Sequence, residues 1–194
     1  AVQRRLEGVA ASMGLRSHLF KRAPGHPPYY EQTLEWRRDF LGAASVDQLC
    51  KSIIMENTRL PAPEVPAGQA PAVVVDGRYK YVVVVVQYTR KLHKERLVDA
   101  VRALEGDKAL GKKQYNMRLV DGALSDLLSG FEHNAVTPLG LATPGLPIIL
   151  HSAIAALPEG TFWLGGGEVD LKVRFDCAEF VEAFRPLVRD VCAE

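Results

Sequence analysis

The sequence predicts one α/β domain built on a mixed β-sheet, and three observations support this fold class. The chain has 194 residues, 47% of them apolar and 24% charged, which is the length and composition of one globular domain with a sizeable core. Runs rich in β-branched residues alternate with segments of helical periodicity. Five consecutive valines at 82–86 cannot form a strand with one wet face, so they indicate a central strand that is covered on both faces.

Residues 1–44 are expected to form a helical extension ahead of the main domain. Apolar residues at positions 2, 6, 9 and 13 recur at helical spacing and predict an amphipathic helix over residues 2–13. Pro24, Pro27 and Pro28 predict a rigid, non-helical connector over residues 21–30, because proline lacks a backbone N–H and restricts the residue before it. A second helix is predicted from about Tyr30 to Leu41.

The main domain is expected to span residues 45–194 and to begin with a short helix and a strand. Ser45 and Gln48 have the spacing of a capping box, and the β-rich run "KSIIM" follows them. The Pro-rich stretch at 59–72 predicts a flexible, solvated insertion. Asp76-Gly77 is a strong hairpin signal before the valine strand.

The second half of the domain alternates helices with strands. The predicted helices are Leu92–Leu104, Asp121–Leu128 with a stop at Gly130, Ser152–Leu157 and a last helix that Asp176 caps and that reaches Phe184. The predicted strands are "PIILH", "TFWL" and "EVDLKVRF". In "EVDLKVRF", apolar residues at 169, 171, 173 and 175 alternate with Asp170, Lys172 and Arg174. This period of two is typical of a half-buried strand.

The cysteines and histidines give little support for a cofactor. The three cysteines lie far apart without C-x-x-C spacing, which argues against a disulfide framework and a zinc site and favours a reducing compartment. The five histidines are scattered, so we expect no metal and no cofactor.

The sequence also predicts no membrane span. No apolar run approaches the ~20 residues that a spanning helix needs. The N-terminal segment lacks the apolar core of a secretory signal. It is basic and amphipathic like a mitochondrial presequence, but Glu7 and the absence of an initiator Met weigh against that interpretation. We therefore expect a cytoplasmic protein.

Charge is unevenly distributed along the chain. Residues 1–118 hold 20 Lys/Arg and 12 Asp/Glu, a net charge of +8, whereas residues 119–194 hold 4 and 11, a net charge of −7. Such a dipolar chain can steer a polyanion to its basic side. The alternative is that the basic residues only solvate helices.

Two segments carry polar side chains that a plain scaffold does not require. Lys51 stands where a short helix meets an apolar strand, and is either an edge residue that reaches water or a functional amine in a pocket. On spacing alone the edge residue is favoured. The segment "GFEHNAVTPLGL" crowds Glu132, His133 and Asn134 between apolar anchors. It is either an ordinary loop with a left-handed Asn134 or a wall of backbone donors around a small ligand.

A third segment, Gly165-Gly166-Gly167, lies between two predicted strands. A phosphate-binding loop needs a helix after its glycines, and here a strand follows, so a dinucleotide or P-loop site is excluded. Glycines between strands usually mark a bulge or a tight bend. Three together also let another backbone or a ligand come close.

Five segments in order resemble the YbaK/prolyl-tRNA-synthetase-associated family of aminoacyl-tRNA deacylases, in its eukaryotic, free-standing branch. The segments are "LCKSIIMEN", "YKYVVVVVQYTRKL", "SGFEHNAVTPLGL", "PIILHSAI" and "FWLGGGEVDLKVRF". Each is weakly specific alone, but together they cover roughly residues 45–184. The stretch "PPYY" ahead of Lys51 resembles the N-terminal extension of that branch.

The resemblance implies a compact domain with a curved mixed sheet and flanking helices that hydrolyses amino acids wrongly esterified to tRNA. Lys51 matches the essential lysine of the family and is the expected catalytic residue. The expected substrate-binding residues are Tyr30, Gly130, His133, Asn134, Val136, Thr137, Pro138, Gly140, Gly165, Gly166, Gly167 and Asp170. An aminoacyl ester is already activated, so the protein has to position the ester and a water and stabilise the oxyanion, which backbone N–H groups can do.

The chain departs from the family pattern in two places. Members that remove alanine carry a histidine near the position of Gly165, so the resemblance does not predict that specificity. The insertion at 59–72 has no counterpart in the family.

A second interpretation is a non-catalytic tRNA-binding or assembly module of an aminoacyl-tRNA synthetase complex. Both interpretations make tRNA the partner, bound through phosphate contacts of the basic half. The residues expected to make these contacts are Arg90, Lys91, Lys94, Lys112 and Lys113. The sequence does not predict which amino acid or which tRNA is the substrate.

Overall fold

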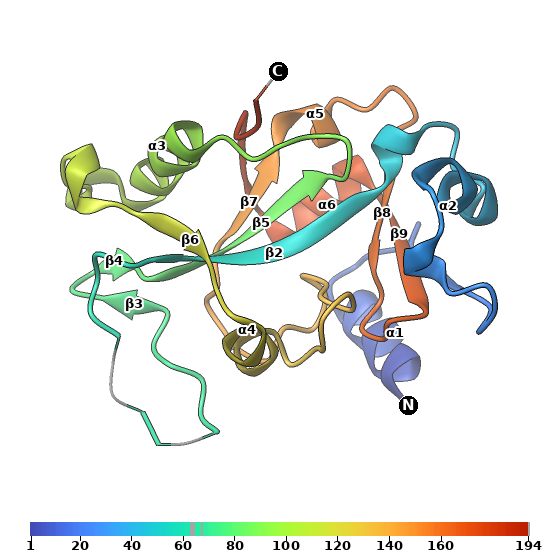
Figure 1. Cartoon of the computed structure of the whole chain (residues 1–194), viewed down its shortest axis with the longest axis horizontal. Helices are drawn as coiled ribbons and strands as arrows, with labels where there is room; N and C mark the ends of the chain where they lie inside the picture. The colour runs from blue at the N-terminus through green and yellow to red at the C-terminus, as the bar shows by residue number, and fades with distance from the viewer. Residues whose placement is uncertain (63–64, 67, 194) are drawn as a thin grey trace.

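A five-stranded mixed sheet forms the centre of the computed structural model, which describes residues 1–62, 65–66 and 68–193 (Figure 1). The strand order is β10-β7-β5-β2-β6. These strands are β2 (Cys50–Asn57), β5 (Tyr81–Gln87), β6 (Met117–Leu119), β7 (Ile148–His151) and β10 (Leu187–Arg189). Because β5 is antiparallel to β2 and parallel to β7, the predicted mixed sheet is confirmed.

The valine run is the central strand β5, as the sequence predicts. Val83 and Val85 face one core, and Val82, Val84 and Val86 face another. The helices that contribute to the first core are α1 (Val2–Ser12), α4 (Gly122–Ser129), α5 (Ser152–Ala155) and α6 (Cys177–Phe184), whereas α3 (Lys94–Glu105) covers the second. All five valines are at most 1% exposed, so neither face of β5 meets water.

A second, antiparallel sheet has the strand order β1-β9-β8. Its strands are β1 (Leu19–Arg22), β8 (Thr161–Gly165) and β9 (Leu171–Asp176). A parallel bridge between Leu49 and Trp163 joins this sheet to the start of β2. The sequence did not predict β1, whose first part precedes the Pro-rich connector, because four residues are too few for a periodic pattern. Pairing with β9 holds this segment extended.

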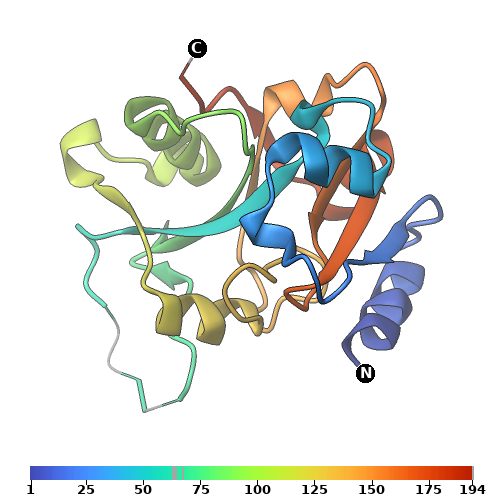
Figure 2. The same cartoon turned by 45° about the vertical axis from the view of Figure 1, so that its right-hand side comes forward.

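The N-terminal 44 residues pack onto the same cores as the rest of the chain. Helix α1 agrees with its predicted span and buries Leu6 and Ala10 completely. The predicted helix from Tyr30 was placed too early: Tyr29–Glu31 form a 3-10 turn, η1, and α2 covers only Leu34–Leu41. The reason is a cap, since the Thr33 hydroxyl accepts a hydrogen bond from the Trp36 N–H. Figure 2 shows α2 and η1 in front of the junction between β2 and β8.

Most local turn and cap predictions are confirmed. Asp76 and Gly77 take positive φ angles of 52° and 74° between β3 (Val74–Val75) and β4 (Arg78–Tyr79). Ser45 and Gln48 form the capping box of the 3-10 helix η2 (Val46–Gln48). The described part of the predicted insertion at 59–72 contains no helix or strand, and residues 63, 64 and 67 lie outside the described residues.

The remaining differences concern short elements and the start of β9, which begins at Leu171 because residues 168–170, predicted as strand, form a turn. Strands β6 and β10 and the 3-10 turns η3 (Gly106–Lys108) and η4 (Lys112–Gln114) were not predicted, and α5 is shorter than expected. Elements of three or four residues depend on their neighbours more than on their own sequence. In the described part of the chain, no helix combines the length and apolar character needed to cross a lipid bilayer.

Candidate active site

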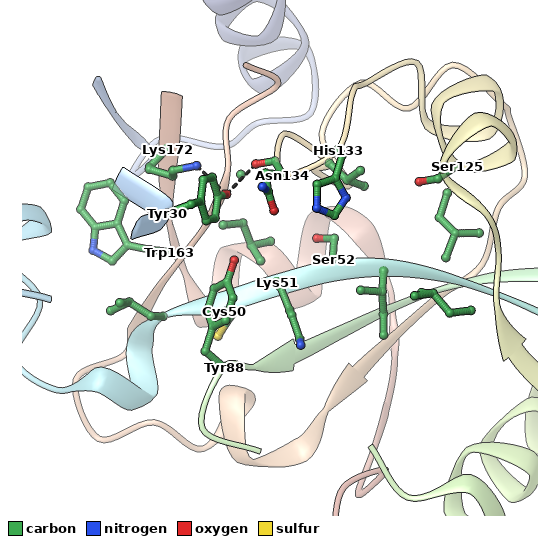
Figure 3. A pocket seen from close by; sticks show the side chains of 18 of the residues that line it. Tyr30, Cys50, Lys51, Ser52, Tyr88, Ser125, His133, Asn134, Trp163 and Lys172 are labelled. Atoms are coloured by element: carbon green, nitrogen blue, oxygen red, sulfur yellow. Dashed lines mark hydrogen bonds between the residues drawn. The ribbon is translucent and has the colours of Figure 1, made fainter. Parts of the chain in front are cut away.

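A cavity of about 470 Å³ opens beside the first half of β2 (Figure 3). The cavity exists because the two strands that adjoin this edge of β2, β8 and β6, contact it at different points. At one end, Leu49 is bridged to Trp163 of β8. At the other end, the ladder to β6 reaches only Met55, with one further hydrogen bond from the Val120 N–H to the Ile54 carbonyl. In the part of the chain that the structure describes, no strand pairs with the edge of β2 between these points, and the cavity occupies that gap.

Lys51 lies in this open stretch of β2. Its ammonium group is 5.6 Å from the centre of the Tyr88 ring. In the described part of the chain it has neither a carboxylate partner nor a hydrogen bond. Figure 3 shows the Lys51 side chain running away from the labelled residues of the 131–142 loop, alongside Tyr88. The Lys51 cation therefore stands at one end of the cavity and is available to an anion.

Ser52 is a cavity residue that the sequence analysis missed. Its hydroxyl is buried and has no hydrogen-bond partner among the described residues. The Ile54 carbonyl faces the open edge of β2. Because alternate residues of a strand present their backbone groups to the same edge, the Ser52 N–H also points toward the cavity. The position of Ser52 directly after Lys51 was the only feature of the sequence that could have indicated it as a cavity residue. The neighbouring Cys50 is buried, which raises the pKa of its thiol and argues against a thiolate nucleophile.

The loop after α4 forms the wall opposite β2. His133, Asn134 and Val136 line the cavity. Asn134 has φ of 68°, the left-handed conformation that the sequence suggested, and its carbonyl accepts a hydrogen bond of 2.6 Å from the Tyr30 hydroxyl. The Ala135 carbonyl accepts a second one, of 3.0 Å, from the Gly167 N–H. These bonds hold two consecutive carbonyls in the middle of the wall.

The other predicted loop residues do not line the cavity. Thr137 and Pro138 are buried in the loop. Gly130 ends α4 with φ of 77° and packs against Ala142, and Gly140 packs against Leu6 of α1. The structure places these four residues behind the wall, where they support it.

The three consecutive glycines have separate environments. Gly165 lines the cavity, and a Cβ there would lie 2.7 Å from the Val136 carbonyl oxygen. A Cβ on Gly166 would lie 2.9 Å from the Leu171 side chain and 3.0 Å from its backbone. Gly167 has φ of 90° and packs against Leu6. The structure thus brings Gly165 alone to the cavity and uses the other two for close packing of the β8–β9 turn.

Lys172 is a second amine in the cavity wall and was not expected there. The alternation in β9 predicted a half-buried strand, yet Lys172 is only 3% exposed. Its Nζ donates to the Tyr30 hydroxyl at 2.7 Å and to the Val169 carbonyl at 2.8 Å. Burial lowers the pKa of Lys172 from an ordinary value of 10.5 to about 7, with a further decrease from the charge of Arg37.

Tyr30 is brought to the cavity as predicted, and Asp170 is not. Arg37, which is 9% exposed, holds the η1 turn by donating to the Tyr29 and Tyr30 carbonyls at 3.0 and 2.6 Å. Burial raises the pKa of the Tyr30 hydroxyl above its ordinary value. Asp170 instead forms a 2.6 Å ion pair with Arg22 on the surface.

The electrostatic character of the cavity follows from its composition. Lys51, Lys172 and His133 line it, and none of the lining residues is an Asp or a Glu. Among the described residues there is no group of three His, Cys, Asp or Glu side chains that could hold a metal ion. The arrangement suits a ligand that is anionic or rich in hydrogen-bond acceptors.

The five basic residues expected to contact RNA are exposed. Arg90 and Lys91 lie in the turn after β5, and Lys94 begins α3. Lys112 and Lys113 lie in η4, where the Lys112 Nζ forms a 2.7 Å ion pair with Asp99 of α3. This pair partly neutralises Lys112.

Comparison with known proteins identifies the fold. No protein family and no curated protein sequence match the chain. Among solved structures, a candidate trans-editing enzyme for prolyl-tRNA synthetase superposes with a TM-score of 0.69 at 19% identity, over 100% of this chain and 98% of that chain. A hypothetical protein gives a TM-score of 0.69 at 17% identity, over 97% and 99%. A scaffold protein used for computational epitope grafting gives 0.71 at 18% identity, over 100% and 97%. The chain therefore has the fold of these proteins along its whole length.

Proposed function

We propose that the protein is a trans-editing aminoacyl-tRNA deacylase, which hydrolyses the ester between a wrongly attached amino acid and the 3′ end of tRNA. The observation that carries this proposal is the cavity at the open edge of β2, where Lys51 and Ser52 follow one another and neither the Lys51 amine nor the Ser52 hydroxyl has a hydrogen-bond partner among the described residues. The fold shared with a candidate trans-editing enzyme and the resemblance of five segments to a deacylase family support it. We propose the cytoplasm as its location.

The acyl group is proposed to lie in the cavity beside Gly165 and the wall formed by Asn134 and Val136. The loop carbonyls pack directly against Gly165, where even a Cβ would lie 2.7 Å from the Val136 carbonyl oxygen, so the acyl group lies next to this contact and not between its two sides. The Asn134 backbone is fixed by Tyr30, so the wall is set before substrate binds. Such preorganisation lets the site hold the ester in one orientation.

Two neighbouring groups on β2 are proposed to act on the ester and its phosphate. The Ser52 N–H and hydroxyl point into the gap and are suited to stabilise the oxyanion that develops as water attacks, with one such donor worth roughly 10²–10³ in rate. Lys51, at the other end of the cavity, is suited to hold the terminal phosphate of the tRNA as a point charge. No protein nucleophile is needed in this scheme.

The test is release of amino acid from a panel of mischarged tRNAs. We expect the wild-type protein to deacylate at least one of them, and Lys51→Ala to lower kcat/KM by at least roughly 10²-fold with the fold retained. Lys108→Ala, at an exposed lysine away from the cavity, is the matched control and keeps the wild-type rate. A Lys51→Ala protein that retains most of the rate contradicts the role of Lys51.

The same panel separates catalysis from binding alone. A protein that binds tRNA and releases no amino acid from any member of the panel would be a tRNA-binding or assembly module of a synthetase complex. The binding residues proposed for either case are the exposed basic residues near α3 and η4 described above.

A further inference from the structure

Lys172 reaches the cavity because its neighbour across the sheet has no side chain. In the antiparallel pair of β8 and β9, Lys172 lies directly opposite Gly165. Directly opposed residues project from the same face of a sheet. Since Gly165 has no Cβ, the residue directly opposite Lys172 does not cover the amine on this face, and both residues line the cavity. Figure 3 shows the Lys172 amine beside Tyr30, at the end of the cavity occupied by Asn134.

The hydrogen bonds around Lys172 leave one position on its nitrogen unused. The amine donates to the Tyr30 hydroxyl and to the Val169 carbonyl. The carbonyl can only accept, and the Tyr30 hydroxyl gives its own proton to the Asn134 carbonyl. A neutral amine has two N–H groups and one lone pair. Both N–H groups are therefore used, and in the described part of the chain nothing donates to the lone pair.

Burial and the charge of Arg37 disfavour the protonated form of Lys172. Its Nζ lies 4.7 and 4.3 Å from the centres of the Tyr29 and Tyr30 rings, which attract a cation, whereas burial and the charge of Arg37 lower the pKa of the amine. Asp170 favours the charged form, but its carboxylate is exposed and paired with Arg22.

Two further groups complete these surroundings. Lys21 is opposite Lys172 on β1 and adds a second positive charge on the same sheet face, with its amine bound to the Phe40 carbonyl. Tyr88 shares a side-chain hydrogen bond with Tyr30. Neither supplies a negative charge to Lys172.

We propose that Lys172 is the general base of the site, an inference that rests on the proposed deacylase function. As a water oxygen forms a bond to the ester carbonyl carbon, the Lys172 lone pair takes one proton from that water. When the bond between the carbonyl carbon and the ribose oxygen breaks, the Lys172 ammonium returns the proton to the ribose oxygen. The products are the free amino acid and the tRNA hydroxyl, and the lysine is neutral again. A group whose pKa lies near the working pH is suited to both transfers.

The competing role for Lys172 is purely structural, as a support for Tyr30. The two roles differ in what they require of the nitrogen. A support needs only the two N–H donors, whereas a base needs the lone pair to titrate in the working pH range. The experiment therefore has to report on protonation and not only on activity.

The first measurement needs no substrate. NMR titration of the lysine ε-carbons in the wild-type protein, with the Lys172 signal assigned from its loss in Lys172→Met or Lys172→Arg, is expected to give a midpoint near 7 for Lys172. A midpoint at the ordinary lysine value, near 10.5, overturns the proposal, because the lone pair would then be occupied at neutral pH.

The second measurement is the pH dependence of kcat/KM on a mischarged tRNA that the wild-type protein deacylates. The wild-type profile is expected to rise to a plateau with a midpoint near 7. Lys172→Met loses that ionisation and falls by roughly 10²–10⁴-fold at the plateau. Lys172→Ala is partly rescued by methylamine in proportion to its free-base concentration. Lys21→Met, on the same sheet face but outside the cavity lining, is the matched control: it keeps the plateau rate and the ionisation, with a midpoint no lower than that of the wild-type protein.

The outcomes separate the two proposals. An active wild-type protein whose pH profile is unchanged in Lys172→Met, or a Lys172→Ala variant that methylamine does not rescue, overturns the role of Lys172 alone. A wild-type protein that deacylates no tRNA in the panel overturns the deacylase function and this inference together. If the variants fail to fold, the wild-type titration still decides.

Discussion

Replacing Lys172 with Met is expected to change how the stability of the protein depends on pH. The folded-state pKa of Lys172 is about 7, below the ordinary value of 10.5 that applies to the unfolded chain. Between these two pH values the unfolded chain binds a proton that the folded protein does not. Raising the pH therefore favours the folded state, and this contribution is complete only above the unfolded pKa. Below pH 7 both states are protonated, and the folded protein bears the full cost of a buried charge.

The magnitude follows from the two pKa values. Each pH unit of full proton difference corresponds to about 1.4 kcal/mol, and the slope is half-developed at the folded pKa. Between pH 7 and pH 9 the wild-type protein is thus expected to gain about 2 kcal/mol of stability relative to Lys172→Met. For a domain of this size that difference corresponds to roughly 4–8 °C in Tm. Lys172 is 3% exposed, so solvent screening reduces the value little.

The assay is chemical denaturation of both proteins at several pH values between 6 and 9.5, followed by subtraction of the two curves of unfolding free energy. All other titrating groups are shared and largely cancel in the difference. The difference is expected to be nearly flat at about pH 6 and to rise with increasing slope through pH 7 up to pH 9. Two parallel curves would refute the reasoning, because they would mean that Lys172 keeps its proton in the folded protein.

Two further predictions concern the glycines and the basic surface. Gly166→Val is expected to cost about 1–3 kcal/mol of stability, because its Cβ would clash with the Leu171 backbone. The kcat per folded molecule is expected to stay nearly unchanged. A loss of substrate binding without a fall in Tm would instead place Gly166 in the cavity wall. The double reversal Lys112→Glu and Lys113→Glu is expected to weaken tRNA binding and to reduce the slope of log Kd against log salt by ~0.7–0.9 per lost contact, with hydrolysis of a minimal aminoacyl-adenosine ester unchanged. Because Lys112 is paired with Asp99, Lys113 is expected to contribute more to tRNA binding. Equal tRNA affinity of the wild-type protein and the variant at two salt concentrations would show that this surface is not part of the binding site.

The sequence by itself determined the features that depend on nearest neighbours in the chain. Five valines require a strand with two dry faces, and β5 has them. Asp76-Gly77 adopts positive φ angles that few other pairs accept, so the turn is fixed locally. The capping box at Ser45 and the left-handed Asn134 follow from side-chain chemistry within three residues. Lys51 and the loop residues His133, Asn134 and Val136 were also found from sequence, and the structure brings them to one cavity.

Only the tertiary structure decided the rest of the site. Alternation along β9 assigns Lys172 to one face of its sheet, but whether that face meets water depends on what covers it. The cover is the Tyr29–Glu31 turn, which comes from more than a hundred residues earlier in the chain and is fixed there by Arg37. Ser52 became a cavity residue in the same way, because β6 and β8 leave β2 at different points. A periodic pattern defines the direction of a side chain, and the packing of distant segments defines its environment.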